Sequence, residues 1–146
     1  MKFRLILDDD REEEVLIYAK KESALTREIE ALINAHSATL VGYNEEKQIV
    51  SLSPEEIVCI TVEDGRTFAL TADGKWQLRE RLYTVEEKLG PQFVKINQSC
   101  IANVRQIDHF DASLGGSLLV FFKNGYRDYV SRRQLKRVKE RIGFRL

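Results

Sequence analysis

The chain of 146 residues is poor in several residue types, and each shortage excludes a class of protein. It holds two cysteines, two histidines and two prolines, and no apolar run approaches the roughly 18 residues that a membrane-spanning helix requires. The opening MKFRLILDDD is too short and turns acidic too quickly for a signal peptide, so we expect a cytoplasmic protein. Hydrophobic residues at 43% and charged residues at 32% are typical of a folded globular domain and exclude a disordered one.

The few cysteines and histidines argue against a metal site or a catalytic centre. Cys59 and Cys100 lie in apolar, strand-like runs, where a thiol acts as a small hydrophobic group; a redox switch or a metal ligand is the less favoured alternative. His36 and His109 are far apart in the sequence. The chain also lacks a glycine-rich phosphate loop, a nucleophile with a histidine placed beside it, and carboxylates at metal-ligand spacing. We therefore expect no enzymatic activity, cofactor or metal.

The zero net charge conceals an uneven distribution of charge along the chain. Residues 91–146 contain eleven Lys and Arg against four Asp and Glu, a net charge of +7, so residues 1–90 carry −7. A basic C-terminal segment favours nucleic acid as a partner, because phosphate is attracted there and repelled by the acidic remainder.

The beginning of the chain predicts a small β-β-α module. Residues 2–7 and 15–19 are strand-like, and they flank the charged run DDDREEE at 8–14, which is typical of a solvated turn. The run at 22–36 then places apolar residues at helical spacing after Ser23, a suitable N-cap.

Two further strand-like runs, at 39–43 and 49–52, precede the pair Ser53-Pro54. Because proline interrupts regular structure and restricts the residue before it, we place an approximate boundary at this pair. The sequence thus predicts an N-terminal module over residues 1–52 and a main domain over residues 53–146.

The main domain begins with a series of antiparallel hairpins from Ile57. Asp64-Gly65 and Asp73-Gly74 are dipeptides typical of tight turns that need positive φ. The run at 75–89 then spaces its apolar residues on one helical face, and the Gly-Pro pair at 90–91 ends it, so we expect a helix there.

After residue 91 the pattern returns to strands. The polar corner at 97–99 and the turns at Gly115-Gly116 and Asn124-Gly125 separate strand-like runs, and Ser131 opens a basic helix that runs toward Arg141. The fold class predicted is therefore mainly β (α+β): an antiparallel domain with one or two short helices, preceded by the small β-β-α module.

Two blocks of this region resemble the LytTR family of DNA-binding domains. The first, FVKINQSCIAN at 93–103, has an aromatic residue, a polar triplet ending in Ser, an apolar pair and Asn. The second is FFKNG at 121–125, followed by Val-Ser-Arg-Arg at 130–133. With the elements that precede them, the resemblance covers roughly residues 50–142. It implies an antiparallel β domain that reads DNA with loops rather than with a recognition helix.

The resemblance implies base contacts from three places in the chain. These are Arg66 and Thr67 at a hairpin tip, Asn97 and Gln98 at the polar corner, and Arg133 after Ser131. Where this chain has Asn97-Gln98, the family usually has His-Arg or His-Asn. The residue types suit the task, because Arg pairs with guanine O6 and N7 and Asn or Gln with adenine N6 and N7.

Other polar side chains are suited to phosphates, which position a protein on DNA without reading its sequence. We assign this role to Lys95, Ser99, Lys123, Arg132, Lys136 and Arg137. If about six phosphates are contacted, binding should weaken about 10³-fold or more between 50 and 200 mM salt.

Each of these assignments has a simpler alternative. The corner at 97–99 could be a solvated strand bend, the tip at 65–67 an ordinary hairpin, and Arg132 and Arg133 plain helix surface. The aromatic residues of 121–129 are better interpreted as core and edge pairs than as platforms for stacked bases.

The sequence as a whole predicts a sequence-specific transcription regulator that binds double-stranded DNA, as a homodimer on paired half-sites. By analogy with stand-alone members of the LytTR family, residues 1–52 would mediate self-association or bind a regulatory protein, which can be membrane-bound. The alternatives are an RNA-binding β module, which needs a basic sheet with exposed aromatic residues, and a protein-interaction adaptor without sequence-specific DNA binding.

Overall fold

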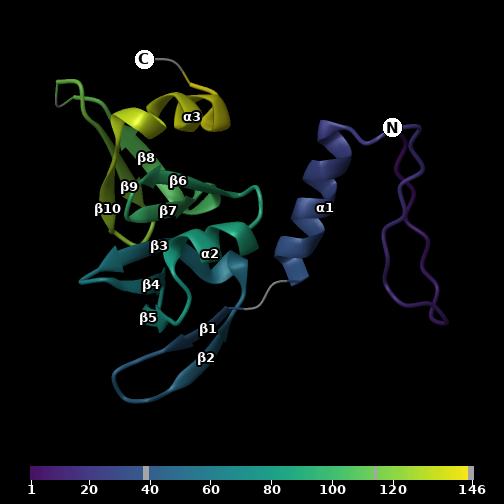
Figure 1. Cartoon of the computed structure of the whole chain (residues 1–146), viewed down its shortest axis with the longest axis horizontal. Coiled ribbons are helices and arrows are strands. Elements are labelled where there is room, and N and C mark those ends of the chain that lie inside the picture. The colour runs from purple at the N-terminus through teal and green to yellow at the C-terminus, as the bar shows by residue number, and fades with distance from the viewer. Residues whose placement is uncertain (38–39, 114, 145–146) are drawn as a thin grey trace.

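The computed structural model describes residues 1–37, 40–113 and 115–144. Its strands form two antiparallel sheets (Figure 1). The larger, in the spatial order β2-β1-β5-β4-β3-β7-β6, comprises β1 (Leu40–Tyr43), β2 (Ile49–Leu52), β3 (Ile57–Glu63), β4 (Arg66–Thr71), β5 (Gly74–Leu78), β6 (Phe93–Asn97) and β7 (Cys100–Asn103). The smaller, in the order β10-β9-β8, comprises β8 (Ile107–Asp111), β9 (Leu118–Phe122) and β10 (Arg127–Val130). The predicted mainly β (α+β) class is confirmed.

Three α-helices accompany the sheets within the described residues: α1 (Ala24–Ser37), α2 (Leu82–Lys88) and α3 (Arg132–Ile142). The large sheet lies in the middle of the β domain, with α3 and the small sheet against one face and α2 against the other. The expected final helix after Ser131 is confirmed as α3, which Gly143 ends in the left-handed conformation that favours glycine.

The β domain has two hydrophobic cores, one on each face of the large sheet, because β3 is buried on both faces. Cys59 points into the core between the two sheets, with Val138 of α3, whereas Ile60 points into the core beneath α2, with Val85. Such burial explains the continuous apolar run of β3, since a strand covered on both sides does not alternate. Cys59 and Cys100 are fully buried, as expected of thiols that act as small hydrophobic groups.

The helix predicted over residues 75–89 is wrong in its first half. Gly74–Leu78 form β5, which pairs with β4, and α2 begins only after Arg81. The apolar residues of this run fit a helical face and an alternating strand equally well up to Leu78, and hydrogen bonding to β4 decides for the strand.

The large sheet also places the end of the N-terminal module earlier than the sequence predicts. β1 pairs with β5, so β1 and β2 belong to the sheet of the main domain rather than to a separate module over residues 1–52. We use the term N-terminal module for residues 1–37. In it α1 is a helix as expected, but residues 2–7 and 15–19 are extended without the strand pairing predicted for them. Figure 1 shows this module standing beside the β domain.

Candidate nucleic-acid interface

The three loops singled out in the sequence lie along one margin of the β domain. The backbone N–H of Val62, beside the β3–β4 tip, donates to the carbonyl of Ser99, and the N–H of Ser131, before α3, donates to the carbonyl of Ile96; each distance is 2.9 Å. The strand ends that carry the three loops are thus hydrogen-bonded in series. We call residues 64–67, 97–99 and 131–133 the loop edge.

Asn97 is the residue that locks the middle of the loop edge. Its side-chain Nδ2 donates to the carbonyl of Tyr129 at 2.8 Å and to Oδ1 of Asp128 at 3.0 Å. Its Oδ1 accepts the backbone N–H of Ser99 at 2.8 Å. The side chain is 2% exposed, so its amide is used inside the protein and is not presented to a base. The structure therefore differs from the base-reading role expected for Asn97.

Thr67 also differs from its expected place. It is a buried residue of β4, paired across the sheet with Val62 and Leu78. The neighbouring Arg66 is exposed, because side chains on a strand alternate between faces and the hairpin tip ends beside it. Of the two residues expected to read bases from this tip, only Arg66 is available.

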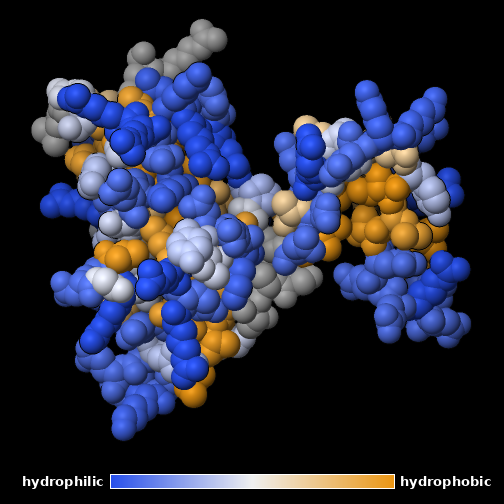
Figure 2. Space-filling view, viewed as in Figure 1, coloured by the Kyte–Doolittle hydropathy of each residue, from blue (hydrophilic) through white to orange (hydrophobic). Residues whose placement is uncertain are grey.

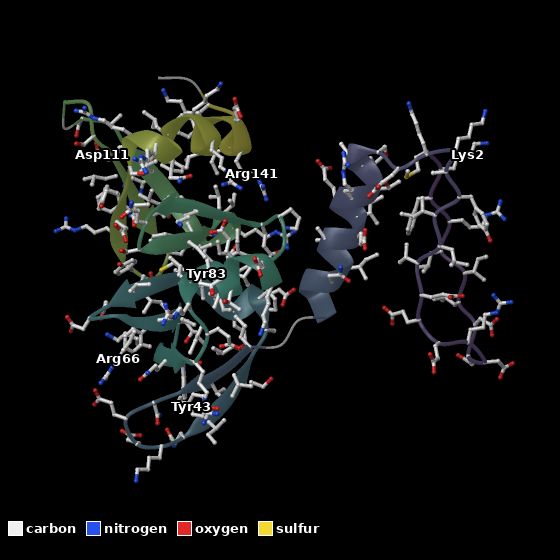
Figure 3. All side chains as sticks on the ribbon, viewed as in Figure 1. Lys2, Tyr43, Arg66, Tyr83, Asp111 and Arg141 are labelled. Atoms are coloured by element: carbon white, nitrogen blue, oxygen red, sulfur yellow. The ribbon has the colours of Figure 1, made fainter. Side chains whose placement is uncertain are left out.

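Three of the predicted base-reading side chains are exposed on the loop edge, one on each loop: Arg66, Gln98 and Arg133. Among the described residues, no carboxylate lies within ion-pair distance of either arginine. Figure 3 shows Arg66 on the outer side of the β domain, away from the N-terminal module. An uncompensated guanidinium on an exposed loop is available to phosphate or to the edge of a guanine base.

The predicted phosphate-contacting residues divide into two groups. Arg132 and Lys136 are exposed on α3, whose opposite side packs on the core through Val138, and Ser99 is exposed on the loop edge. These three residues lie on or near the loop edge. A DNA duplex that contacts Arg66, Gln98 and Arg133 would also bring its phosphates within their reach.

The second group lies elsewhere. Lys95 and Arg137 line an open groove together with Arg141 of α3 and Glu28 of α1, on the side of the domain that faces the N-terminal module. Lys123 is exposed in the turn between β9 and β10. This turn lies at the opposite end of β10 from Ser131. The structure does not bring these three cations to the loop edge.

Asp128 is a residue of the site that the sequence reasoning missed. Its carboxylate accepts from Asn97 and from the hydroxyl of Tyr126, the latter at 3.2 Å. Burial, together with the negative charge of Asp128, raises the pKa of Tyr126 well above its ordinary value, so the phenol stays protonated and keeps donating. The signal in the sequence was weak: a single acidic residue among the basic residues of 123–137.

Asn103, the last residue of the first motif block, is a structural residue as well. Its side chain donates to the carbonyl of Ile57 at 2.8 Å and accepts the N–H of Arg105 at 3.1 Å, and it is almost fully buried. The two asparagines of the block therefore fix the ends of β6 and β7 to their neighbours.

An antiparallel β domain with exposed arginine and glutamine on hydrogen-bonded loops has the features expected of a DNA-binding domain. The comparison with known families agrees: residues 47–143 match the family model described as "LytTr DNA-binding domain". The chain belongs to the LytTR family. This is a family of DNA-binding domains and not of enzymes, which confirms the non-enzymatic prediction.

Relatives extend the similarity to nearly the whole chain. The chain is 30% identical to a protein of Staphylococcus aureus strain NCTC 8325 and 31% identical to a protein of the bovine strain RF122. Each alignment covers 97% of this chain and 98% of the relative. Both are named as HTH-type transcriptional regulators. Among solved structures, it is similar to the LytTr DNA-binding domain of a Bacillus cereus protein, with a TM-score of 0.68, 18% identity, and coverage of 73% of this chain and 98% of that one.

The described part of this chain contains no helix-turn-helix, despite the wording of the relatives' names, because strands separate each helix from the next. No described helix is long and apolar enough to cross a membrane.

Proposed function

We propose that this protein is a transcription regulator that reads specific DNA sequences in the major groove with Arg66, Gln98 and Arg133. The observation that carries the proposal is the loop edge itself. Hydrogen bonds hold three loops in one row, and each loop exposes one side chain able to make paired hydrogen bonds to a base. Each such pair would contribute about 1–3 kcal/mol of discrimination between bases.

Phosphate contacts would come from Ser99, Arg132 and Lys136, which surround the reading side chains. Such contacts fix the register of the protein on the duplex, so that the loops meet the same base pairs each time. We expect Asn97 and Thr67 to act through the shape of the loops, because both are buried. Binding to chromosomal DNA would place the protein in the cytoplasm.

The DNA-bound form is proposed to be a homodimer on two half-sites. One β domain offers a short row of three readers, and pairing two such domains raises affinity and fixes the half-site spacing. Sedimentation of the complex at saturation measures the stoichiometry, and one protomer for each operator would rule this part out.

Selection of bound sites from random duplexes tests the proposal. Recovery of a common motif, bound far more tightly than a scrambled duplex at physiological salt, is the expected result. Recovery of no motif, with only salt-sensitive binding, would refute sequence-specific reading. Competition by single-stranded RNA at least as strong as by the selected duplex would favour the RNA-binding alternative instead.

A further inference from the structure

The N-terminal module exposes an apolar surface that the rest of the described chain does not cover. Phe3 is 90% exposed, Leu7 88% and Tyr18 94%. The large hydrophobic residues of this module that are more than half exposed are Met1, Phe3, Leu5, Ile6, Leu7, Val15, Leu16 and Tyr18. Figure 2 shows hydrophobic residues of this module gathered between α1 and the two extended arms. Contiguous apolar surface of this kind marks an interaction site on a protein that folds in water.

The module is also incomplete as a folded unit. Val15, Ile17 and Ala19 face α1 across an open cleft, where they meet Thr26 and Ile29. Among the described residues, no strand pairing joins the two arms. A unit of fewer than about 40 residues rarely buries enough surface to be stable alone, and an isolated two-stranded hairpin is marginal. Association with another module would supply the missing layer.

Charge is separated along the arms. The turn at 8–14 carries six carboxylates and one arginine. The opposite, open end carries Lys2, Arg4, Lys20 and Lys21, with Glu22 beside them. Figure 3 shows Lys2 at the end of the arms away from this turn. The module is thus acidic at one end, basic at the other and apolar between them.

We propose that two copies of this chain associate through their N-terminal modules about a two-fold axis, with the arms antiparallel. The acidic turn of each copy then lies beside the basic open end of the other, and the apolar surfaces are buried between them. A contact of this type is isologous, so the same patch serves on both copies and the assembly closes as a dimer. A parallel arrangement would place the two acidic turns together, and repulsion disfavours it.

A second copy fits this surface better than a foreign partner of a single charge. A partner of one sign would complement one end of the arms and repel the other, whereas an inverted second copy matches both ends at once. The inference uses residues 1–37, which take no part in the proposed reading of DNA. It therefore stands or fails independently of the proposed reading of bases.

Charge reversal with complementation tests the inference on the full chain. A turn-reversed variant carries Asp9→Lys, Glu12→Lys and Glu14→Lys. An end-reversed variant carries Lys2→Glu, Lys20→Glu and Lys21→Glu. Sedimentation equilibrium without DNA measures self-association of the wild type, of each variant alone and of their equimolar mixture.

We expect the wild type to dimerise in the micromolar range, and each variant alone to self-associate at least about tenfold more weakly, because like charges then face each other. The mixture should regain dimers, since the reversed turn of one variant meets the reversed end of the other. Both variants keep every apolar residue, so recovery in the mixture also shows that neither has lost its fold.

Three results would overturn the inference. A wild type that stays monomeric at the highest measurable concentration would show that the surface does not pair two copies of this chain. Variants that dimerise as tightly as the wild type would place the contact elsewhere, and failure of the mixture to recover would exclude antiparallel charge pairing. The matched control is Glu45→Lys with Glu46→Lys in the exposed β1–β2 turn, which should leave self-association unchanged.

Discussion

The side-chain amide of Asn97 donates to Oδ1 of Asp128 at 3.0 Å, joining two residues 31 positions apart in the sequence. The same amide donates to the carbonyl of Tyr129, so it fixes the turn between β6 and β7 against β10. A polar side chain of a type that can pair with a base is therefore used to hold the loop edge in place. The neighbouring Gln98 is exposed and is free to make the proposed contact with DNA.

Substitution at these adjacent positions should separate stability from specificity. Asn97→Ala removes the amide donor to the Tyr129 carbonyl and to Asp128, and the acceptor of the Ser99 N–H, so we expect it to lower the free energy of unfolding by about 1–3 kcal/mol. Gln98→Ala should change it by less than about 0.5 kcal/mol and relax the preference at one base pair. Urea unfolding and binding to single-base variants of the site measure the two effects. The opposite pattern would return Asn97 to the role of a base reader.

Gly42 tests whether β1 and β2 belong to the main domain. A Cβ at this position would lie 2.7 Å from Cβ of Trp76 and 3.1 Å from Cδ1 of Leu52. Because Trp76 lies in β5, Gly42→Ala should destabilise the whole β domain by about 1–3 kcal/mol. Glu45→Ala, in the exposed turn, is the control and should change stability by less than about 0.5 kcal/mol. If the main domain of Gly42→Ala unfolds at the wild-type midpoint, β1 and β2 do not contribute to its stability. The domain boundary would then lie at Ser53-Pro54, as the sequence predicts.

Tyr126 should make the β domain sensitive to alkaline pH. Burial and the Asp128 carboxylate raise the pKa of its phenol in the folded state above the ordinary value of 10.0, so the folded state binds the proton more tightly than the unfolded chain. The stabilising contribution is complete below pH 10 and is lost as the pH rises above it. The stability difference between the wild type and Tyr126→Phe, measured by urea unfolding, should therefore be constant at pH 8 and 9 and shrink above about pH 10. A constant difference would contradict this account.

The two groups of cations should differ in their contribution to DNA binding. Arg132 lies on the loop edge, whereas Arg137 lines the groove toward α1. Arg132→Ala should weaken binding to all sequences and reduce the salt slope by about one. Arg137→Ala, the matched arginine variant on the same helix, should leave the slope near the wild-type value. Affinity measured across a salt series gives both slopes, and equal losses would mean that DNA also reaches the groove.

Much of the fold could be predicted because its signals are local. The Asp64-Gly65 turn is one example: both residues have positive φ, at 50° and 75°, as a tight hairpin turn requires. The final helix is another, since Ser131 and Gly143 mark its two ends. The run at 75–89 failed because Leu78 suits either periodicity, and the choice depends on pairing with β4.

The candidate site could be predicted only in part, for a related reason. The sequence indicates which loops carry amides and arginines, but burial depends on partners that are distant along the chain. The partner of Asn97 lies beyond three further strands, and Lys95 and Arg137 meet only through the packing of α3 on β6. Residue type identified the loops, and tertiary contacts decided which side chains are free to act.

The central claim is that three loops each read their own base pairs, and specificity profiling of loop variants tests it most directly. Arg66→Ala, Gln98→Ala and Arg133→Ala would each be profiled against all single-base variants of the selected site, with Lys136→Ala as the phosphate-contacting control. We predict that each loop variant loses about 1–3 kcal/mol of discrimination at a different position of the site, whereas Lys136→Ala weakens binding evenly. If all four variants weaken binding evenly and leave every base preference intact, the loop edge does not read sequence and the account is contradicted.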